Sequence, residues 1–250
     1  MNTHALVVRQ QPVIEELSSE FKHAGTVVGD GVNQAKIAVE IQKACKSNNE
    51  TKALSLLARN DIIDLDVLDD QKSNALHYAC LYNMSQTINE LVQRNIPLNQ
   101  ANNEGKTPLH YLCQHEAPAL LKLMIKNGAK KSVQDNEGNT PLHIACTHCK
   151  LGMIEVLAES KQALNRYNDA ENTPLFISIK HSHVEGIRML LAHGADTNLE
   201  DKLGNKPHNC AKFYPRIPDQ LIAKMKEKAT PLTEKIKSKA KALISKGEEA

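Results

Sequence analysis

NTPLHIAC, residues 139–146, decides the fold, because close copies of this phrase recur along the chain. The copies are SNALHYAC at residues 73–80, KTPLHYLC at 106–113 and NTPLFISI at 172–179, and a degenerate copy begins at Lys206. Their equivalent residues are Asn74, Thr107, Thr140, Thr173 and Lys206, which follow one another at intervals of 33 residues. A fixed period of this length is typical of proteins built from stacked structural repeats.

Each copy predicts the beginning of a helix at the Asn or Thr that we number as position zero. Asn and Thr are preferred N-caps, and the proline that follows in three copies is tolerated in a first helical turn. A second apolar stripe, at positions 14, 17 and 18, predicts another helix in every repeat; in the third clear repeat it is Ile154, Leu157 and Ala158. Such short helices cannot bury their apolar sides alone, so we expect the repeats to stack into an α-solenoid.

These residues resemble the ankyrin-repeat family, in GKTPLH, GNTPLH and the ending HGADTNLED at residues 193–201. The resemblance covers about residues 37–228. It implies an all-α, ankyrin-type α-solenoid of stacked helix-turn-helix repeats with projecting β-turns. Lys72 and Glu171 stand where other copies have a turn glycine, so we expect less regular turns at these two places.

The same comparison of copies divides the chain into three parts. Residues 1–35 form an N-terminal extension, residues 36–229 the repeat domain, and residues 230–250 a Lys-rich tail. The repeat domain comprises a divergent first repeat at 36–68, repeats at 69–101, 102–134, 135–167 and 168–200, and a capping repeat at 201–229. Within the extension, the apolar spacing from Val13 to Phe21 predicts a short helix, and GTVVGDGVNQ at residues 25–34 predicts a loop.

Composition excludes several classes of function. The net charge of +2 gives no overall field toward nucleic acid, and no stretch approaches 18 consecutive apolar residues. The six cysteines fall mostly within predicted helices, which favours free buried thiols and a cytoplasmic location. We therefore expect no nucleic-acid partner, and we expect the protein to be a monomer.

Two sets of residues invite a metal or catalytic interpretation. His77, His110 and His143 recur three residues after position zero, where the family resemblance implies a hydrogen bond that holds the turn. Cys146 and Cys149 form a CxxC beside His143 and His148, but Cys146 should face the core while His148 faces outward, so one zinc ion cannot easily reach both. We predict no enzyme activity, no metal and no cofactor.

Partner binding is the function that the sequence favours. By the family resemblance, positions 7 and 8 line a concave groove beside the turn tips, and folding does not dictate the residues found there. Tyr78 and Tyr111, on the same helices, are candidate anchors at the amino-terminal half of the groove, and packing is the alternative that stays open for them. The candidate partner-binding residues are Tyr78, Leu81, Tyr82, Lys106, Tyr111, Gln114, His115, Asn139, Thr147, His148, Asn172, Lys180 and His181.

The resulting prediction is a protein–protein interaction adaptor or scaffold. The row of His115, His148 and His181 suggests an extended acidic or aromatic partner whose affinity changes between pH 7.5 and 6. One alternative is a secreted effector of an intracellular bacterium, which would act on a host protein in the host cytoplasm through the same groove. Another is tethering to a membrane surface by the amphipathic, Lys-rich tail.

Overall fold

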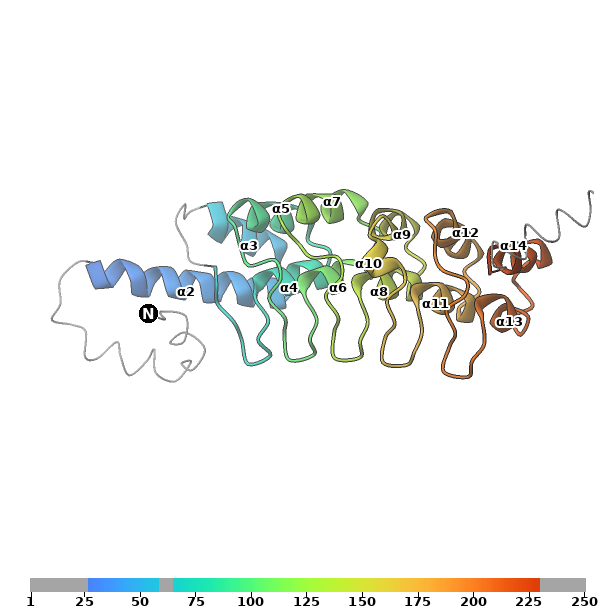
Figure 1. The fold of residues 1–250 in the computed structure, drawn as a ribbon. Coiled ribbons are helices and arrows are strands. Elements are labelled where there is room, and N and C mark those ends of the chain that lie inside the picture. Colours follow the sequence, from blue (N-terminus) through green and yellow to red (C-terminus); the bar gives the residue numbers. More distant parts are fainter. Residues whose placement is uncertain (1–26, 59–64, 230–250) are drawn as a thin grey trace, which may run out of the picture.

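The computed structural model describes residues 27–58 and 65–229, and these residues form a stack of helix pairs (Figure 1). The first helices of the pairs are α2 (Val27–Lys46), α4 (Ala75–Leu81), α6 (Pro108–Leu112), α8 (Pro141–Thr147), α11 (Pro174–Lys180) and α13 (Pro207–Ala211). The second helices are α3 (Glu50–Ala58), α5 (Ser85–Gln93), α7 (Pro118–Lys126), α9 (Leu151–Ala158), α12 (Val184–Ala192) and α14 (Asp219–Ala229). A short helix, α10 (Lys161–Leu164), follows α9.

Figure 1 shows two rows of helices and a set of turns that project from one side of the stack. The first helices form the row nearer the turns, and the second helices form the other row. Each of α4, α6, α8 and α11 begins directly after its predicted capping residue, at the expected interval of 33 residues. The predicted all-α solenoid of stacked pairs is confirmed.

The prediction of a loop at residues 25–34 is wrong for the part that the structure describes. Residues 27–34 belong to α2, which is 20 residues long and extends beyond the stack (Figure 1). Its other end is anchored, because Ala38, Ile41 and Cys45 are buried against the neighbouring helices. An anchored helix propagates more easily than it nucleates, and this outweighs the cost of about 1 kcal/mol for each of Gly29 and Gly31.

The remaining predicted boundaries lie near the two ends of the chain. The boundary proposed after residue 35 falls inside α2 and stays a prediction. The helix expected at Val13–Phe21 and the tail at 230–250 lie outside the described residues. At the other end of the stack, α13 keeps only five residues, and α14 begins at Asp219, within the predicted capping repeat.

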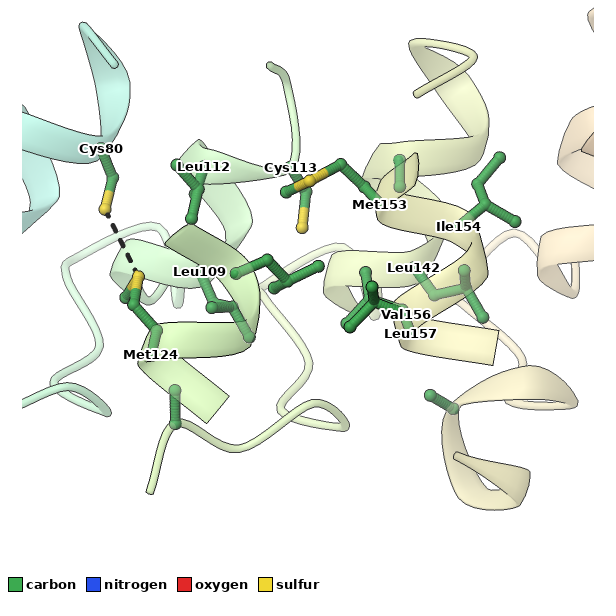
Figure 2. Close-up of a cluster of buried hydrophobic side chains, with 14 of the residues drawn as sticks. Cys80, Leu109, Leu112, Cys113, Met124, Leu142, Met153, Ile154, Val156 and Leu157 are labelled. Atoms are coloured by element: carbon green, nitrogen blue, oxygen red, sulfur yellow. Dashed lines mark hydrogen bonds between the residues drawn. The ribbon is translucent and has the colours of Figure 1, made fainter. Parts of the chain in front are cut away.

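The core runs the length of the stack and contains a column of thiols. Cys45, Cys80, Cys113 and Cys146 occupy equivalent positions in successive first helices and are completely buried. Figure 2 shows Cys80 directed at Met124 of α7, with 4.0 Å between the two sulfur atoms. Burial raises the pKa of the Cys45 and Cys146 thiols to about 12. These thiols are therefore neutral and pack as small apolar groups, as predicted.

Candidate functional site

The projecting turns share one pattern of hydrogen bonds. The first residue of each turn is Asp or Asn. In four of the five turns one of its side-chain oxygens accepts the backbone N–H groups two and four residues later, whereas Asn168 accepts the N–H four residues later. At Asp135 these bonds come from Glu137 at 3.0 Å and Asn139 at 2.8 Å. Asp69 and Asn102 do the same in the preceding turns. The side chain thus stabilises the turn in which it is the first residue.

Neighbouring turns are also joined at their tips. The backbone N–H of Asn136 donates to the carbonyl of Glu104 at 2.9 Å, and that of Asp169 donates to Glu137 at 3.0 Å. Lys72 and Glu171 have φ of 56° and 54°, and their turns keep the same backbone hydrogen bonds as the glycine-containing copies. The expectation of a less regular turn is therefore wrong for Lys72, because the surrounding hydrogen bonds hold it in the left-handed conformation. The turn of Glu171 keeps its backbone bonds but has only the Asn172 N–H on the side-chain oxygen of Asn168.

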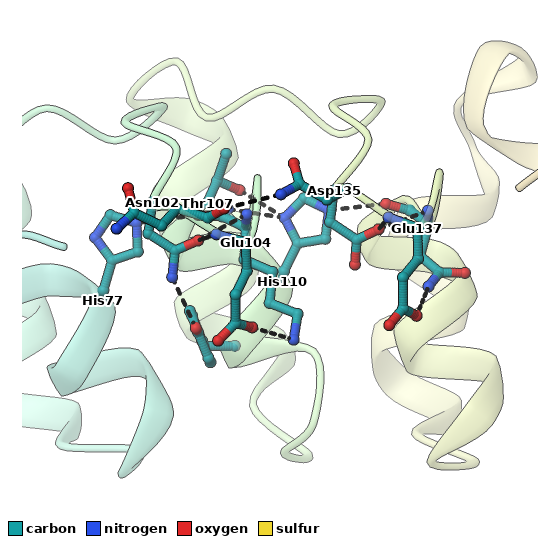
Figure 3. A network of polar contacts seen from close by, with 12 residues as sticks. His77, Asn102, Glu104, Thr107, His110, Asp135 and Glu137 are labelled. Atoms are coloured by element: carbon teal, nitrogen blue, oxygen red, sulfur yellow. Dashed lines mark hydrogen bonds and ion pairs between the residues drawn. The ribbon is translucent and has the colours of Figure 1, made fainter. Parts of the chain in front are cut away.

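The histidines three residues after position zero tie each helix to the next turn (Figure 3). His143 accepts the backbone N–H of Thr140 on Nδ1 at 3.1 Å and contacts the carbonyl of Asn172 through Nε2 at 3.0 Å. Because a carbonyl can only accept, Nε2 carries the proton and the ring is neutral. His77 and His110 make equivalent bonds in their own repeats. The structural role implied by the family resemblance is confirmed.

Burial keeps these imidazoles uncharged. It lowers the pKa of His77 and of His143 to about 4, even though the carbonyls that they contact act in the opposite direction. Burial also lowers the pKa of His110. Each ring is only 1% exposed, so an additional proton would place a charge in the interior.

The predicted groove row divides into exposed and half-buried members. The exposed members are Tyr82, Thr147, His148, Lys180 and His181, and the half-buried ones are Leu81, Gln114 and His115. Tyr82 is 42% exposed, which makes it one of the few large apolar side chains on the described surface. These residues lie at the ends of the first helices, so one row follows the stack from repeat to repeat.

Several members of this row already have partners within the chain. His115 Nε2 contacts the carbonyl of Leu81 at 2.8 Å and so links two repeats. The Lys180 ammonium donates to Asn172 at 2.6 Å, and the Thr147 hydroxyl donates to the carbonyl of His143 at 3.0 Å. The sequence could not show that His115 would be used in this way, because its partner is a backbone carbonyl 34 residues away.

The histidines of the row influence one another electrostatically. Partial burial lowers the pKa of His148, and the positive charges of Lys150, His115 and His181 lower it further. The ring of His181 in turn stacks on that of His183, with 5.5 Å between ring centroids. Positive charge on neighbouring residues of the row therefore opposes the protonation of His148.

A pocket of about 160 Å³ opens between α4, α6 and their turns. It is lined by Gln71, Ser73, His77, Tyr78, Leu81, Asn102, Glu104 and Tyr111. The Tyr111 hydroxyl accepts a hydrogen bond from Asn102 at 2.9 Å, and the ring lies edge-on to His77 with centroids 6.2 Å apart. Tyr78 and Tyr111 thus pack against the core and also present ring surface to the pocket.

The polar residues of the turn tips are less available than the sequence suggested. Lys106 pairs with Glu104 at 2.6 Å, and Asn139 accepts from Asn168 at 2.8 Å. Asn172 is only 5% exposed and holds Lys180, so we omit it from the surface proposed below. Gln71 and Glu104 also line the pocket. They are turn-tip residues at a spacing of 33, which made them candidates, although the predicted set of binding residues does not include them.

Within residues 27–58 and 65–229, no group of three or more His, Cys, Asp or Glu side chains is placed to hold a metal ion. In the same part of the chain, no helix has the length and apolar character needed to cross a bilayer.

Comparison with known proteins identifies the family to which this stack of helix pairs belongs. The family model described as "Ankyrin repeats (3 copies)" matches residues 41–135 and 112–201, which together make up more than half of the sequence. The chain belongs to the ankyrin-repeat family. As an ankyrin-repeat protein, it presents the first helices and turns as one continuous surface (Figure 1). No curated protein matches the ankyrin-repeat sequence at the threshold applied.

A solved structure similar to this ankyrin-repeat protein is titled "Bd0816 Predatory Endopeptidase from Bdellovibrio bacteriovorus in complex with immunity protein Bd3460". The similar chain in that structure shares 26% sequence identity with this one, at a TM-score of 0.62. The likeness covers 76% of this chain and 98% of the other.

Proposed function

We propose that this ankyrin-repeat protein binds a partner protein along the surface formed by its first helices and turns. The observation that carries the proposal is the exposed row of Tyr82, His148 and His181, which recurs at positions that packing leaves free. Neighbouring positions in the same helices are buried. Affinity would then come from many small contacts along the array, including contacts at the tyrosine-lined pocket.

Two observations support a protein as the partner. The surface is an extended strip with one small pocket, whereas small-molecule sites are usually deeper cavities of about 300–1,000 Å³. The solved structure that resembles this chain is itself a complex between two proteins. Within this proposal the protein acts as an adaptor or scaffold, without catalysis or cofactor.

Affinity capture tests the proposal. The bait is the full chain, compared with a variant that carries Tyr82→Ala, His148→Ala and His181→Ala. His115 stays unchanged, because its ring links two repeats and its removal would confuse binding with folding. We expect the variant to lose a protein that the unchanged chain captures.

The control variant changes exposed residues on the opposite row of helices, namely Gln93→Ala, Lys122→Ala and Glu155→Ala on α5, α7 and α9. It should retain the captured protein. Loss of the same protein from both variants, or from neither, would show that the row is not the binding surface.

The same surface would serve a secreted bacterial effector whose partner belongs to a host cell, so this alternative concerns the origin of the partner. Tethering by residues 230–250 is a separate alternative, and its residues lie outside the described structure. Flotation with liposomes distinguishes tether from adaptor. Full-length chain should float and a chain ending at Lys228 should not if the tail is a tether.

A further inference from the structure

The carboxylate of Asp135 has one oxygen that is satisfied and one that is not. Its Oδ1 accepts the backbone N–H groups of Glu137 and Asn139, and the residue is only 7% exposed. Among residues 27–58 and 65–229, no group forms a hydrogen bond with the buried Oδ2. Figure 3 shows the dashed contacts of Asp135 on one oxygen while the other points away from them. A buried acceptor without a partner is costly, and more so when it is charged.

Asp69 shows what this kind of oxygen binds. It holds the same turn position two repeats earlier, and its Oδ1 likewise accepts two backbone N–H groups. Its Oδ2 accepts the Tyr78 hydroxyl and the Lys46 ammonium, the latter at 3.1 Å. The Asp69 side chain is also mostly enclosed, at 11% exposure, so an ammonium can reach a carboxylate in this position.

Asp135 lacks both of these donors because the repeats diverge there. Ile144 stands at the position of Tyr78, 66 residues later, and offers no hydroxyl. Gln114 stands at the position of Lys46 when the repeats are aligned on their buried cysteines, and it carries no charge. The turn between those of Asp69 and Asp135 has no carboxylate at this position. Asn102 stands there instead, and its side-chain amide donates a hydrogen bond to the Tyr111 hydroxyl.

Nearby cationic and imidazole groups of the chain are engaged elsewhere. Lys106 pairs with Glu104 at 2.6 Å. His110 uses one ring nitrogen for the backbone of Thr107 and the other for the carbonyl of Asn139. The free oxygen of Asp135 thus lies buried within the middle one of the projecting turns, and no donor of the described residues reaches it.

We propose that Oδ2 of Asp135 receives a lysine ammonium of the bound protein, as Oδ2 of Asp69 receives Lys46. This inference rests on the proposed function and specifies one anchor point within it. The partner's lysine would pass beside Gln114 and Ile144, in the place that Lys46 and Tyr78 occupy at Asp69. Binding would give a donor to a buried carboxyl oxygen that has none in the free protein, so this one contact would matter more than an exposed ion pair.

The test uses a blocked octalysine peptide as the probe and the full chain labelled with carbon-13 at aspartate carboxyl groups. We expect the Asp135 carboxyl resonance to shift with saturation as octalysine is added at constant ionic strength. Replacing Asp135 by Asn should weaken peptide binding about tenfold. Replacing Asp169, an exposed carboxylate at the tip of the following turn, by Asn should change the affinity less than about twofold.

A second variant keeps Asp135 and gives its Oδ2 hydrogen-bond donors from the chain itself. Gln114→Lys together with Ile144→Tyr recreates the donors that Asp69 has, and we expect this double variant to abolish the probe-induced shift of the Asp135 resonance.

Three results would each overturn the proposal: an unmoved Asp135 resonance in the unchanged chain, equal losses of affinity for the two aspartate variants, or undiminished peptide binding by the double variant. So would a direct bond between Lys106 and Asp135 in the free protein. None of these readouts depends on the capture experiment with the exposed row, so the two proposals can fail separately.

Discussion

Acidification should destabilise the array through its buried histidines before it affects most carboxylates. His77 and His143 have a pKa of about 4 in the folded chain, against an ordinary value of 6.5. A folded-state pKa that is depressed means that the unfolded chain binds more protons as the pH falls below 6.5, so stability is lost from there down to about pH 4. A protonated ring would also lose Nδ1 as the acceptor for its capping backbone N–H.

The magnitude follows from the two pKa values of each ring. Between pH 7 and pH 5 the free energy of unfolding should fall by about 1.8 kcal/mol for each histidine, or about 3.5 kcal/mol for both. His110 adds a loss in the same direction, because burial lowers its pKa too. Urea denaturation followed by circular dichroism at pH 7, 6 and 5 measures the loss.

A matched pair of variants separates the histidine contribution from other groups. His143→Gln keeps a donor near Asn172 but does not titrate, so its loss between pH 7 and pH 5 should be smaller by about 1.8 kcal/mol. His181→Gln removes an exposed imidazole and should leave the loss unchanged. Equal pH dependence in all three proteins, or a gain of stability on acidification, would refute the assignment of the effect to the buried rings.

Four other expectations follow from the turns, the thiols and the groove. Gly138→Ala should lower the free energy of unfolding by about 1–3 kcal/mol, because φ is +73° and the new Cβ would lie 2.4 Å from Asp169 Oδ1. Lys72→Gly should raise the free energy of unfolding by about 0.5–1 kcal/mol, because glycine adopts a φ of 56° without strain. Urea denaturation measures the effect of both substitutions. In the native chain, a maleimide counted by mass spectrometry should modify Cys149 first, because the other cysteines are buried. An acidic captured partner should bind more tightly at pH 6 than at pH 7.5 as His148 gains part of its charge, the lowered pKa of this residue limiting the gain; equal affinities by calorimetry would argue against the histidine row.

The repeat phrase was enough to predict the stack. Thr140 and Pro141 specify where a helix begins, and the column that contains Cys146 specifies which side is buried. Helix starts and the buried side of each helix are local properties, and the sequence repeats the pattern that predicts them in every copy. The tether made by His143 was also predictable, although only through the family resemblance.

What the sequence could not show depends on contacts between different repeats. Gly29 and Gly31 favour a loop locally, and only packing farther along α2 explains why they are helical. His115 is bonded to a carbonyl in the preceding repeat, so its place in a row of exposed histidines could not be checked in advance. Whether Oδ2 of such an aspartate has a donor depends on side chains of another repeat, as for Asp69 and Lys46, so the turn sequence around Asp135 does not show that its oxygen lacks one.

The bonds between turn tips make each interface of the stack separately observable. The amides of Asn103, Asn136 and Asp169 each donate to the carbonyl of the turn before, although all three residues are exposed. Such an amide exchanges its hydrogen with solvent only when its own interface opens. Deuterium uptake at these three sites therefore reports the cooperativity of the array one junction at a time, including any junction that a bound protein holds closed.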